Sequence, residues 1–229
     1  TGVDCGGSCP NACPGGSVPP TSGPANPPVR NPADVISIYG DFYSGSVGLN
    51  NVPWDDPSNL TEVVVGSDNV IKLDLLNSFL GSSLGSVVNA TNMTHFHMDF
   101  WIANPWVVGQ VFNTKWSNHT GGSGETDAAT ATIALPADGT QNQTWVSLDL
   151  ELLAPPSGSW ATDKGLGISA REALTELLFV PGGTINEAYI DNVYFYKDPT
   201  ASVQDFNALA IKLYPNPTKN SWNISSKEK

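Results

Sequence analysis

Short apolar runs separated by turn residues dominate the middle of this chain. Runs rich in Val, Ile, Leu and aromatic residues, bounded by Gly, Asn, Asp and Ser, are typical of β-strands. Nine of them predict strands at residues 35–43, 62–65, 70–76, 95–103, 107–112, 129–135, 144–152, 177–180 and 188–196. The pattern predicts an all-β fold, an antiparallel jelly-roll β-sandwich with disordered N- and C-terminal tails.

Helical periodicity is almost absent from the chain. One short helix is predicted at residues 170–174, because Ser169 followed by Glu172 matches a capping box. No repeat occurs at the periods of solenoids or propellers.

Strict alternation marks two of the predicted strands. In residues 95–103 one face carries His95, His97, Asp99 and Trp101, and the other carries Phe96, Met98, Phe100 and Ile102. Residues 144–152 alternate in the same way. The apolar set is expected in the core, so the polar set faces solvent or lines a concave surface.

Composition divides the chain into three parts. Residues 1–33 hold six Gly, eight Pro and no aromatic residue, which predicts a linker. Residues 34–198 form the expected sandwich, and residues 199–229 form a second, less regular tail. Cys5, Cys9 and Cys13 all fall in the linker. Three thiols without a nearby His make a poor zinc site, and their odd number predicts a missing or free partner.

Acidic residues exceed basic ones throughout the expected sandwich. Residues 34–198 contain five Lys or Arg against nineteen Asp or Glu. Nucleic acid and anionic membranes are excluded as partners, because both are bound by clustered basic residues. Neutral glycans are favoured over sulfated or uronic ones. No membrane span is expected, since no apolar run reaches about 18 residues, and the absence of a signal peptide suggests an excised fragment.

Four segments carry a resemblance to a known family. They read NPADVISIYGDFYS, MTHFHMDFWIAN, TWVSLDLEL and NEAYIDNVYFYK, and they span residues 31–198. Together they resemble a jelly-roll module found in laminarinases and other algal-glycan-degrading proteins of marine Bacteroidetes. The opening GVDCGGSCPNACPG is similar to the Cys-containing spacers between such modules. Two runs, residues 112–130 and 154–167, look longer than expected for the module.

The C-terminal tail carries a second resemblance. The sequence KLYPNPTKNSWNISS is similar to the start of a type IX secretion sorting domain, with Tyr214, Pro215, Asn216 and Pro217 matching its YPNP turn. The resemblance implies the type IX secretion machinery as a partner and an extracellular location, secreted or on the cell surface. The chain ends at Lys229, short of a full sorting domain.

The first resemblance implies a non-catalytic carbohydrate-binding module. Such a module holds a catalytic domain, attached in cis, on a polysaccharide. The expected ligand is a neutral algal or plant glycan, with β-1,3-glucan (laminarin) first. An adhesion or protein-interaction module is a further alternative, and the exposure of the tryptophans would distinguish the two.

Candidate ligand-binding residues follow from sugar chemistry. Neutral sugars are bound by exposed aromatic faces flanked by polar side chains. The candidates that lie beside turn residues are Trp54, Trp106, Trp116 and Trp160. Trp101 and His97 are added from the polar strand face, and Trp145 is interpreted as structural. For each of the four turn tryptophans the alternative is a role as a loop anchor.

Two metal sites and one catalytic site are considered. By the first resemblance Asp191 corresponds to a residue that often ligates structural Ca²⁺, and Asp41 is its expected partner if the two strands pair. Otherwise Asp191 lies in a β-bulge. His95, His97 and Asp99 form either a metal site or a set of hydrogen-bonded surface groups. Asp149 and Glu151 could serve a jelly-roll hydrolase, but the E-x-D-x-x-E pattern of sandwich-fold laminarinases is absent. A jelly-roll lyase is the other catalytic alternative, but it needs Arg or Lys to neutralise a uronate, and the expected sandwich offers only Arg171 and four Lys.

Overall fold

The fold is given by a computed structural model, which describes residues 16–52, 59–76, 79–105, 110–122, 124–134, 143–154, 166–182 and 185–198, and the backbone of 212–213 and 224–225. The chain divides into two units, Thr1–Lys197 and Asp198–Lys229. In the second unit, β12 (Lys212–Leu213) pairs with β13 (Ile224–Ser225). No helix among the described residues is long and apolar enough to cross a bilayer.

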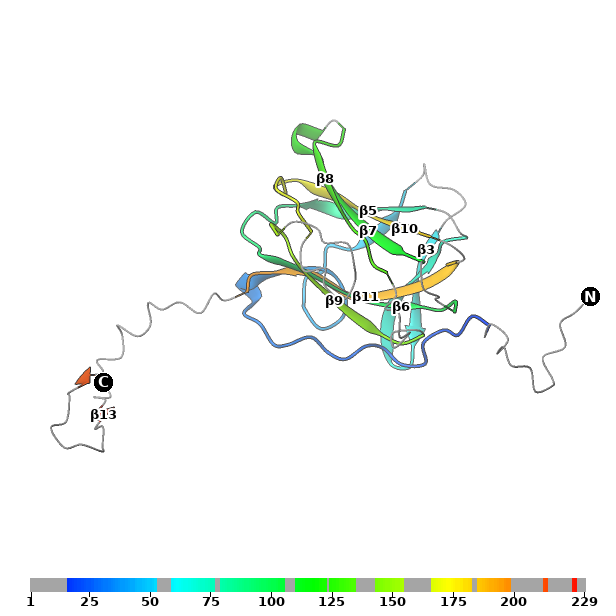
Figure 1. The fold of residues 1–229 in the computed structure, drawn as a ribbon, viewed down its shortest axis with the longest axis horizontal. Coiled ribbons are helices and arrows are strands. Elements are labelled where there is room, and N and C mark those ends of the chain that lie inside the picture. The colour runs from blue at the N-terminus through cyan, green and yellow to red at the C-terminus, as the bar shows by residue number, and fades with distance from the viewer. Residues whose placement is uncertain are drawn as a thin grey trace, which may run out of the picture. The chain divides into compact units, whose positions relative to one another are not determined.

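A six-stranded antiparallel sheet forms one layer of the first unit (Figure 1). Its strands are β1 (Val35–Tyr39), β3 (Asn59–Val65), β4 (Asp68–Asp74), β6 (His95–Ile102), β9 (Val146–Glu151) and β11 (Glu187–Tyr196). β11 lies in the middle of this sheet and pairs with β6 along one edge. Along its other edge, β11 pairs with β4 over its first half and with β1 over its second half.

A five-stranded antiparallel sheet forms the second layer. Its strands, in spatial order, are β2 (Leu49–Asn51), β5 (Leu80–Val88), β10 (Leu174–Pro181), β7 (Phe112–Asn118) and β8 (Asp127–Ala131). The only helical turns in the described residues are two 3-10 turns, η1 (Pro32–Asp34) and η2 (Thr120–Gly122). The predicted jelly-roll β-sandwich is therefore confirmed.

The core lies between the two sheets and is built by alternation. In β6 the apolar face, Phe96, Met98 and Phe100, is almost fully buried. The Trp116 ring of β7 packs against Phe96 and Phe195, with ring centroids 5.3 and 4.7 Å apart. Rings from both layers thus interdigitate, and their burial supplies the main favourable free energy of folding.

Three strands of the second layer differ from the sequence-based prediction. β5 has the sequence LGSSLGSVV, whose Gly and Ser residues hide the strand pattern. β2 has only three residues. β7 occupies part of the run that was expected to be a long loop. Both β5 and β7 pair with β10, so neighbouring strands outweigh weak local propensity.

The predicted helix at residues 170–174 is wrong. Leu174 already begins β10, and the residues before it are held by side chains of β8 and of the turn η2. The Ala170 N–H donates to Asp127 Oδ2 over 2.9 Å. Glu172 accepts a hydrogen bond from Thr120. The carboxylate that would cap a helix is therefore used in a contact distant in sequence.

Residues 16–31, hereafter the strap, lie along the outer face of the six-stranded sheet (Figure 1). They fall in the predicted linker, yet Pro20 and Pro27 are buried. The Val18 N–H donates to the Ala103 carbonyl over 2.8 Å. This part of the predicted linker therefore belongs to the folded unit, a correction to the expected tail. The three cysteines lie outside the described residues.

Candidate functional site

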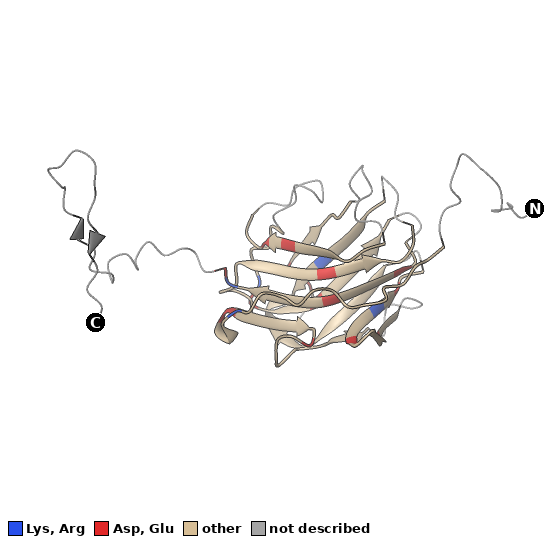
Figure 2. Ribbon diagram, turned by 90° about the horizontal axis from the view of Figure 1, so that it is seen from below, with Lys and Arg blue, Asp and Glu red and all other residues tan. Residues whose placement is uncertain are grey.

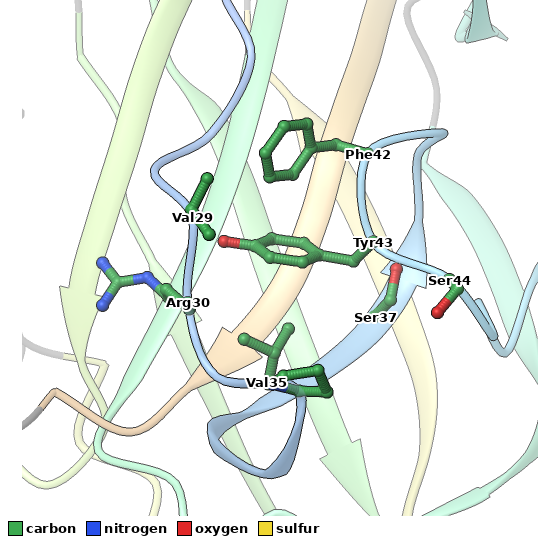
Figure 3. Close-up of a pocket in the computed structure, with 8 residues that line it drawn as sticks. Val29, Arg30, Val35, Ser37, Phe42, Tyr43 and Ser44 are labelled. Carbon is green, nitrogen blue, oxygen red and sulfur yellow. The ribbon is translucent and has the colours of Figure 1, made fainter.

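A pocket lies where the strap, β1 and the loop after β1 meet (Figure 3). Its volume is about 270 Å³. The lining residues come from three short segments, Val29, Arg30 and Pro32 from the first, Val35 and Ser37 from β1, and Phe42, Tyr43 and Ser44 from the loop. The site thus combines aromatic rings, hydroxyl groups and one cationic side chain.

Two adjacent aromatic residues form the apolar part of this pocket. The Phe42 and Tyr43 rings meet edge to face, with centroids 5.1 Å apart. Tyr43 is fixed, because its ring packs on Tyr194 at 5.0 Å and its hydroxyl donates to the Pro28 carbonyl over 2.6 Å. Phe42 remains 37% exposed. The pocket therefore has a rigid aromatic floor with one accessible ring.

Arg30 supplies the positive charge at the pocket. Its guanidinium carbon lies 3.8 Å from the centroid of the Tyr196 ring, a cation–π contact. Its Nε is buried and has no hydrogen-bond partner among the described residues. Asp and Glu far outnumber Lys and Arg on the strands (Figure 2). Arg30 thus brings a positive charge to the lining of this pocket in an otherwise acidic molecule.

His97 lies in a polar network on the outer face of the six-stranded sheet. Its Nδ1 is 3.0 Å from Asp149 Oδ1, and its Nε2 is 3.5 Å from Asp99 Oδ1. Burial alone would lower the pKa of His97, but the hydrogen bonds to the two carboxylates raise it to about 9. The network favours the hydrogen-bonded interpretation of His97 and Asp99 over a metal site, because a charged imidazolium is no metal ligand.

One carboxylate oxygen of Asp149, Oδ1, takes part in this network. Besides His97, it accepts a hydrogen bond from the Tyr196 hydroxyl over 3.0 Å. Burial acts to raise the pKa of Asp149, but the hydrogen bond and the charge of His97 lower it overall. A carboxyl with a lowered pKa is poorly suited to act as the general acid of a hydrolase.

Asp191 lies at the bulge in β11, beside other carboxylates. Its side chain is 2% exposed, and its Oδ1 has no hydrogen-bond partner in the described part of the chain. Burial raises the pKa of Asp191 to about 7, and the charges of Asp68, Asp99 and Asp41 add to the shift. Asn69 donates to Asp41 over 3.0 Å. β1 and β11 pair, as the expected approach of Asp41 to Asp191 required.

No ready-made metal cluster of three or more His, Cys, Asp or Glu ligands occurs among the described residues. The unpartnered Asp191 oxygen and the surrounding negative charge nevertheless suit a hard cation. The bulge expected as the alternative is also present. Asn192 has a φ of 49°, a conformation that Asn tolerates better than most residues.

Trp101 and Trp145 face the strap rather than open solvent. Their rings meet edge to face at 6.0 Å. The Trp101 Nε1–H donates to the Val18 carbonyl over 2.8 Å, and the Trp145 Nε1–H donates to the Ser22 carbonyl over 2.7 Å. Both side chains are partly buried. Their polar edges are therefore already occupied by the protein's own backbone.

Trp116 is a correction to the predicted binding residues. Its side chain is 0% exposed and lies in the core between the sheets. A residue that packs inside cannot stack on a sugar, so Trp116 is structural. Trp54, Trp106 and Trp160 lie outside the described residues, and their role stays a prediction.

The pocket residues were missed because residues 35–43 read as one strand. β1 ends at Tyr39, and the chain then turns through Gly40, with a φ of 130°, and Gly45, with a φ of 79°. Positive φ values are readily available only to glycine. The two glycines that flank the sequence DFYS were the signal that Phe42 and Tyr43 lie in a loop.

The chain is a jelly-roll β-sandwich, and solved structures similar to it include carbohydrate-binding modules. One is the family 11 module from Clostridium thermocellum in complex with a β-1,3-1,4-mixed-linked tetrasaccharide, at 11% identity over 72% of this chain and 96% of that chain, with a TM-score of 0.46. Another is the family 30 module of a cellulosomal cellulase from Clostridium thermocellum, at 11% identity over 72% and 99%, with a TM-score of 0.44.

A third is a family 27 module from Caldicellulosiruptor saccharolyticus in complex with mannohexaose, at 12% identity over 66% of this chain and 91% of that chain, with a TM-score of 0.37. No family model and no curated protein match this sequence.

Proposed function

We propose that this chain is a non-catalytic carbohydrate-binding module that binds a neutral glycan. The observation that carries the proposal is the pocket of Figure 3, with the exposed Phe42 ring beside Tyr43, Arg30 and two serines. An accessible aromatic ring suits the C–H face of a sugar. Hydroxyl and guanidinium groups suit its ring of hydroxyls.

The size of the pocket limits what it can hold. Its volume of about 270 Å³ is just below the usual range for ligand sites, about 300–1,000 Å³. A short part of a glycan, such as a chain end, fits better than a long stretch. The acidic surface repels sulfated and uronic polymers, which favours a neutral ligand.

The resemblance of residues 31–198 to a module of laminarinases suggests which glycan is bound. β-1,3-Glucan (laminarin) is the first candidate, and other algal or plant neutral glycans come next. The same resemblance supports a catalytic domain attached in cis, for which the module would raise the local concentration of substrate. The YPNP tail supports export by the type IX secretion machinery to the cell surface or medium.

A structural Ca²⁺ at Asp191 is part of this proposal. The buried, unpartnered Asp191 oxygen would be a ligand, and the negative charges of the neighbouring Asp68 and Asp41 would attract the ion. Bound there, it would neutralise the mutual repulsion of these acids and join β11 to the loop after β1. That loop carries Phe42 and Tyr43.

Affinity electrophoresis tests the binding proposal. The full chain is run through gels containing laminarin, mixed-linkage glucan, xylan, mannan, agarose or alginate. We expect retardation by a neutral glycan and a loss of at least about tenfold in affinity in Phe42→Ala, because the stacking surface is removed. Leu153→Ala is the matched control, since Leu153 is also exposed but does not line the pocket.

Free migration of the wild type through all six gels would contradict the proposal and favour an adhesion role. Equal retardation of Phe42→Ala and the wild type would leave glycan binding intact but remove it from this pocket. Trp54→Ala, Trp106→Ala and Trp160→Ala would then be run through the same gels.

A further inference from the structure

The strap is held by a row of donors on the sheet and its adjoining loops. Each donor is a side chain, and each acceptor is a strap carbonyl. The five pairs are Gln143 with Gly16 at 3.1 Å, Trp101 with Val18 at 2.8 Å, Trp145 with Ser22 at 2.7 Å, Asn192 with Ala25 at 3.2 Å and Tyr43 with Pro28 at 2.6 Å.

This arrangement recognises the strap as an extended proline-rich chain. Prolines at 19, 20, 24, 27 and 28 fix φ near the polyproline value. One of the five acceptor carbonyls, that of Pro28, belongs to a proline. Aromatic-lined surfaces bind extended proline-rich segments, and Trp101, Trp145 and Tyr43 supply aromatic donors to the strap here. The outer face of the six-stranded sheet is thus a receptor surface, and the occupant is the protein's own strap.

The last residues of the strap form a wall of the pocket. Val29 and Arg30 both line it. Arg30 is fixed over Tyr196, and the carbonyl of Pro28, two residues earlier, is fixed by Tyr43. The strap therefore contacts the Trp101 and Trp145 indoles through Val18 and Ser22. Its last residues line the pocket.

We propose that Trp101 and Trp145 are positioning residues that hold the strap on the sheet and thereby complete a pocket neither of them lines. The positioning role rests on the proposed glycan-binding function, whereas the docking of the strap does not. Neither indole touches the pocket, so any effect on ligand affinity must pass through the strap.

The full chain offers a direct probe of strap docking. Arg30 gives trypsin a cleavage site at the end of the strap, and we expect protection of this site while Arg30 lies on Tyr196. The double variant Trp101→Phe/Trp145→Phe keeps an aromatic ring at both positions and removes both indole donors. Tyr39→Phe is the matched control, since its hydroxyl donates to Glu62 and not to the strap.

We expect trypsin to cut the double variant after Arg30 at least about tenfold faster than the wild type, since two hydrogen bonds are lost. The glycan that retards the wild type should bind the double variant about tenfold more weakly. Tyr39→Phe should match the wild type in both measurements. Circular dichroism confirms that each variant is folded.

An unchanged cleavage rate in a folded double variant would overturn the docking claim. Faster cleavage with unchanged glycan affinity would overturn the positioning claim alone. If no glycan retards the wild type, the proposed function and the positioning claim both fail, while the cleavage rates still decide whether the indoles hold the strap.

Discussion

His97 is the residue whose charge most clearly depends on its surroundings. It is 7% exposed, stacks on Tyr194 with ring centroids 4.7 Å apart, and lies between Asp99 and Asp149. The two carboxylates make the imidazolium the stable form despite burial. At neutral pH the network therefore holds one positive charge between two negative ones.

Stability should fall as pH rises above neutrality. The pKa of His97 is raised from 6.5 to about 9 in the folded state, so its contribution is present in full below about pH 6.5 and lost as pH passes through about 9. Between pH 7.5 and 9.5 we expect the free energy of unfolding to fall by about 2 kcal/mol. Urea unfolding at the two pH values measures it.

His97→Gln is the control for this prediction. The pKa of Asp191, about 7, also affects stability, but its titration is largely complete below the chosen window. Glutamine keeps a hydrogen-bonding side chain and does not titrate. The free energy of unfolding of the variant should therefore not fall between pH 7.5 and 9.5. An equal fall in the free energy of unfolding in both proteins would assign the pH dependence to a group other than His97.

At the scale of elements, the sandwich is held together by rings that cross between the two sheets. Trp116 of β7 is the largest fully buried side chain and contacts Phe96 of β6 and Phe195 of β11. Its indole Nε1 has no hydrogen-bond partner among the described residues. The ring therefore stabilises the fold by packing alone.

Trp116→Phe should destabilise the fold without weakening glycan binding. The smaller ring leaves a cavity in the core. Replacing a buried aromatic residue by alanine lowers the free energy of unfolding by about 3–5 kcal/mol, so we expect Trp116→Phe to lower it by roughly half that amount. Urea unfolding and affinity electrophoresis measure the two effects. A variant with normal stability and no retardation would instead place Trp116 in the ligand site.

At the scale of the whole molecule, excess negative charge is the dominant electrostatic feature. The chain has a formal net charge of -12 at pH 7. Part of this charge gathers at Asp191, where burial and neighbouring acids raise the pKa. Such a group destabilises the folded state when ionised, unless a cation neutralises it.

Calcium should therefore raise the thermal stability of the whole unit. We expect millimolar Ca²⁺ to raise Tm by about 5 °C over the protein in EDTA, because the ion binds only the folded state. Asp191→Asn should lose the response and, in EDTA, be at least as stable as the wild type. Scanning calorimetry with Mg²⁺ as a control measures this. A wild type that ignores Ca²⁺, or a variant that responds equally, would contradict the site.

Prediction from sequence succeeded where local patterns act alone. The alternating strands β6 and β9 and the long apolar β11 were found almost to the residue, because period-two alternation is visible in the sequence. It failed for β5, whose Gly and Ser residues have low strand propensity, and for the helix at residues 170–174, where Asp127 and Thr120 take the polar groups that a cap would use.

The candidate site was predicted only in part. Trp101 and His97 were correctly placed on the polar face of the six-stranded sheet, but their partners come from the strap and from β9. Phe42 and Arg30 line the same pocket but come from separate segments of the chain. A pattern of neighbouring residues in the sequence cannot indicate such a contact. Trp116 was assigned to a loop because its run of turn residues hid the strand β7.

The sequence by itself determined the all-β class, the acidic surface and the alternation that assigns each strand a core face. These depend on short-range periodicity and on composition, and both are properties of the chain before it folds. Only the tertiary structure decided that the proline-rich segment docks on the sheet and completes a pocket. That outcome depends on donors from Trp101, Trp145 and Tyr43, which folding brings to one surface from distant positions.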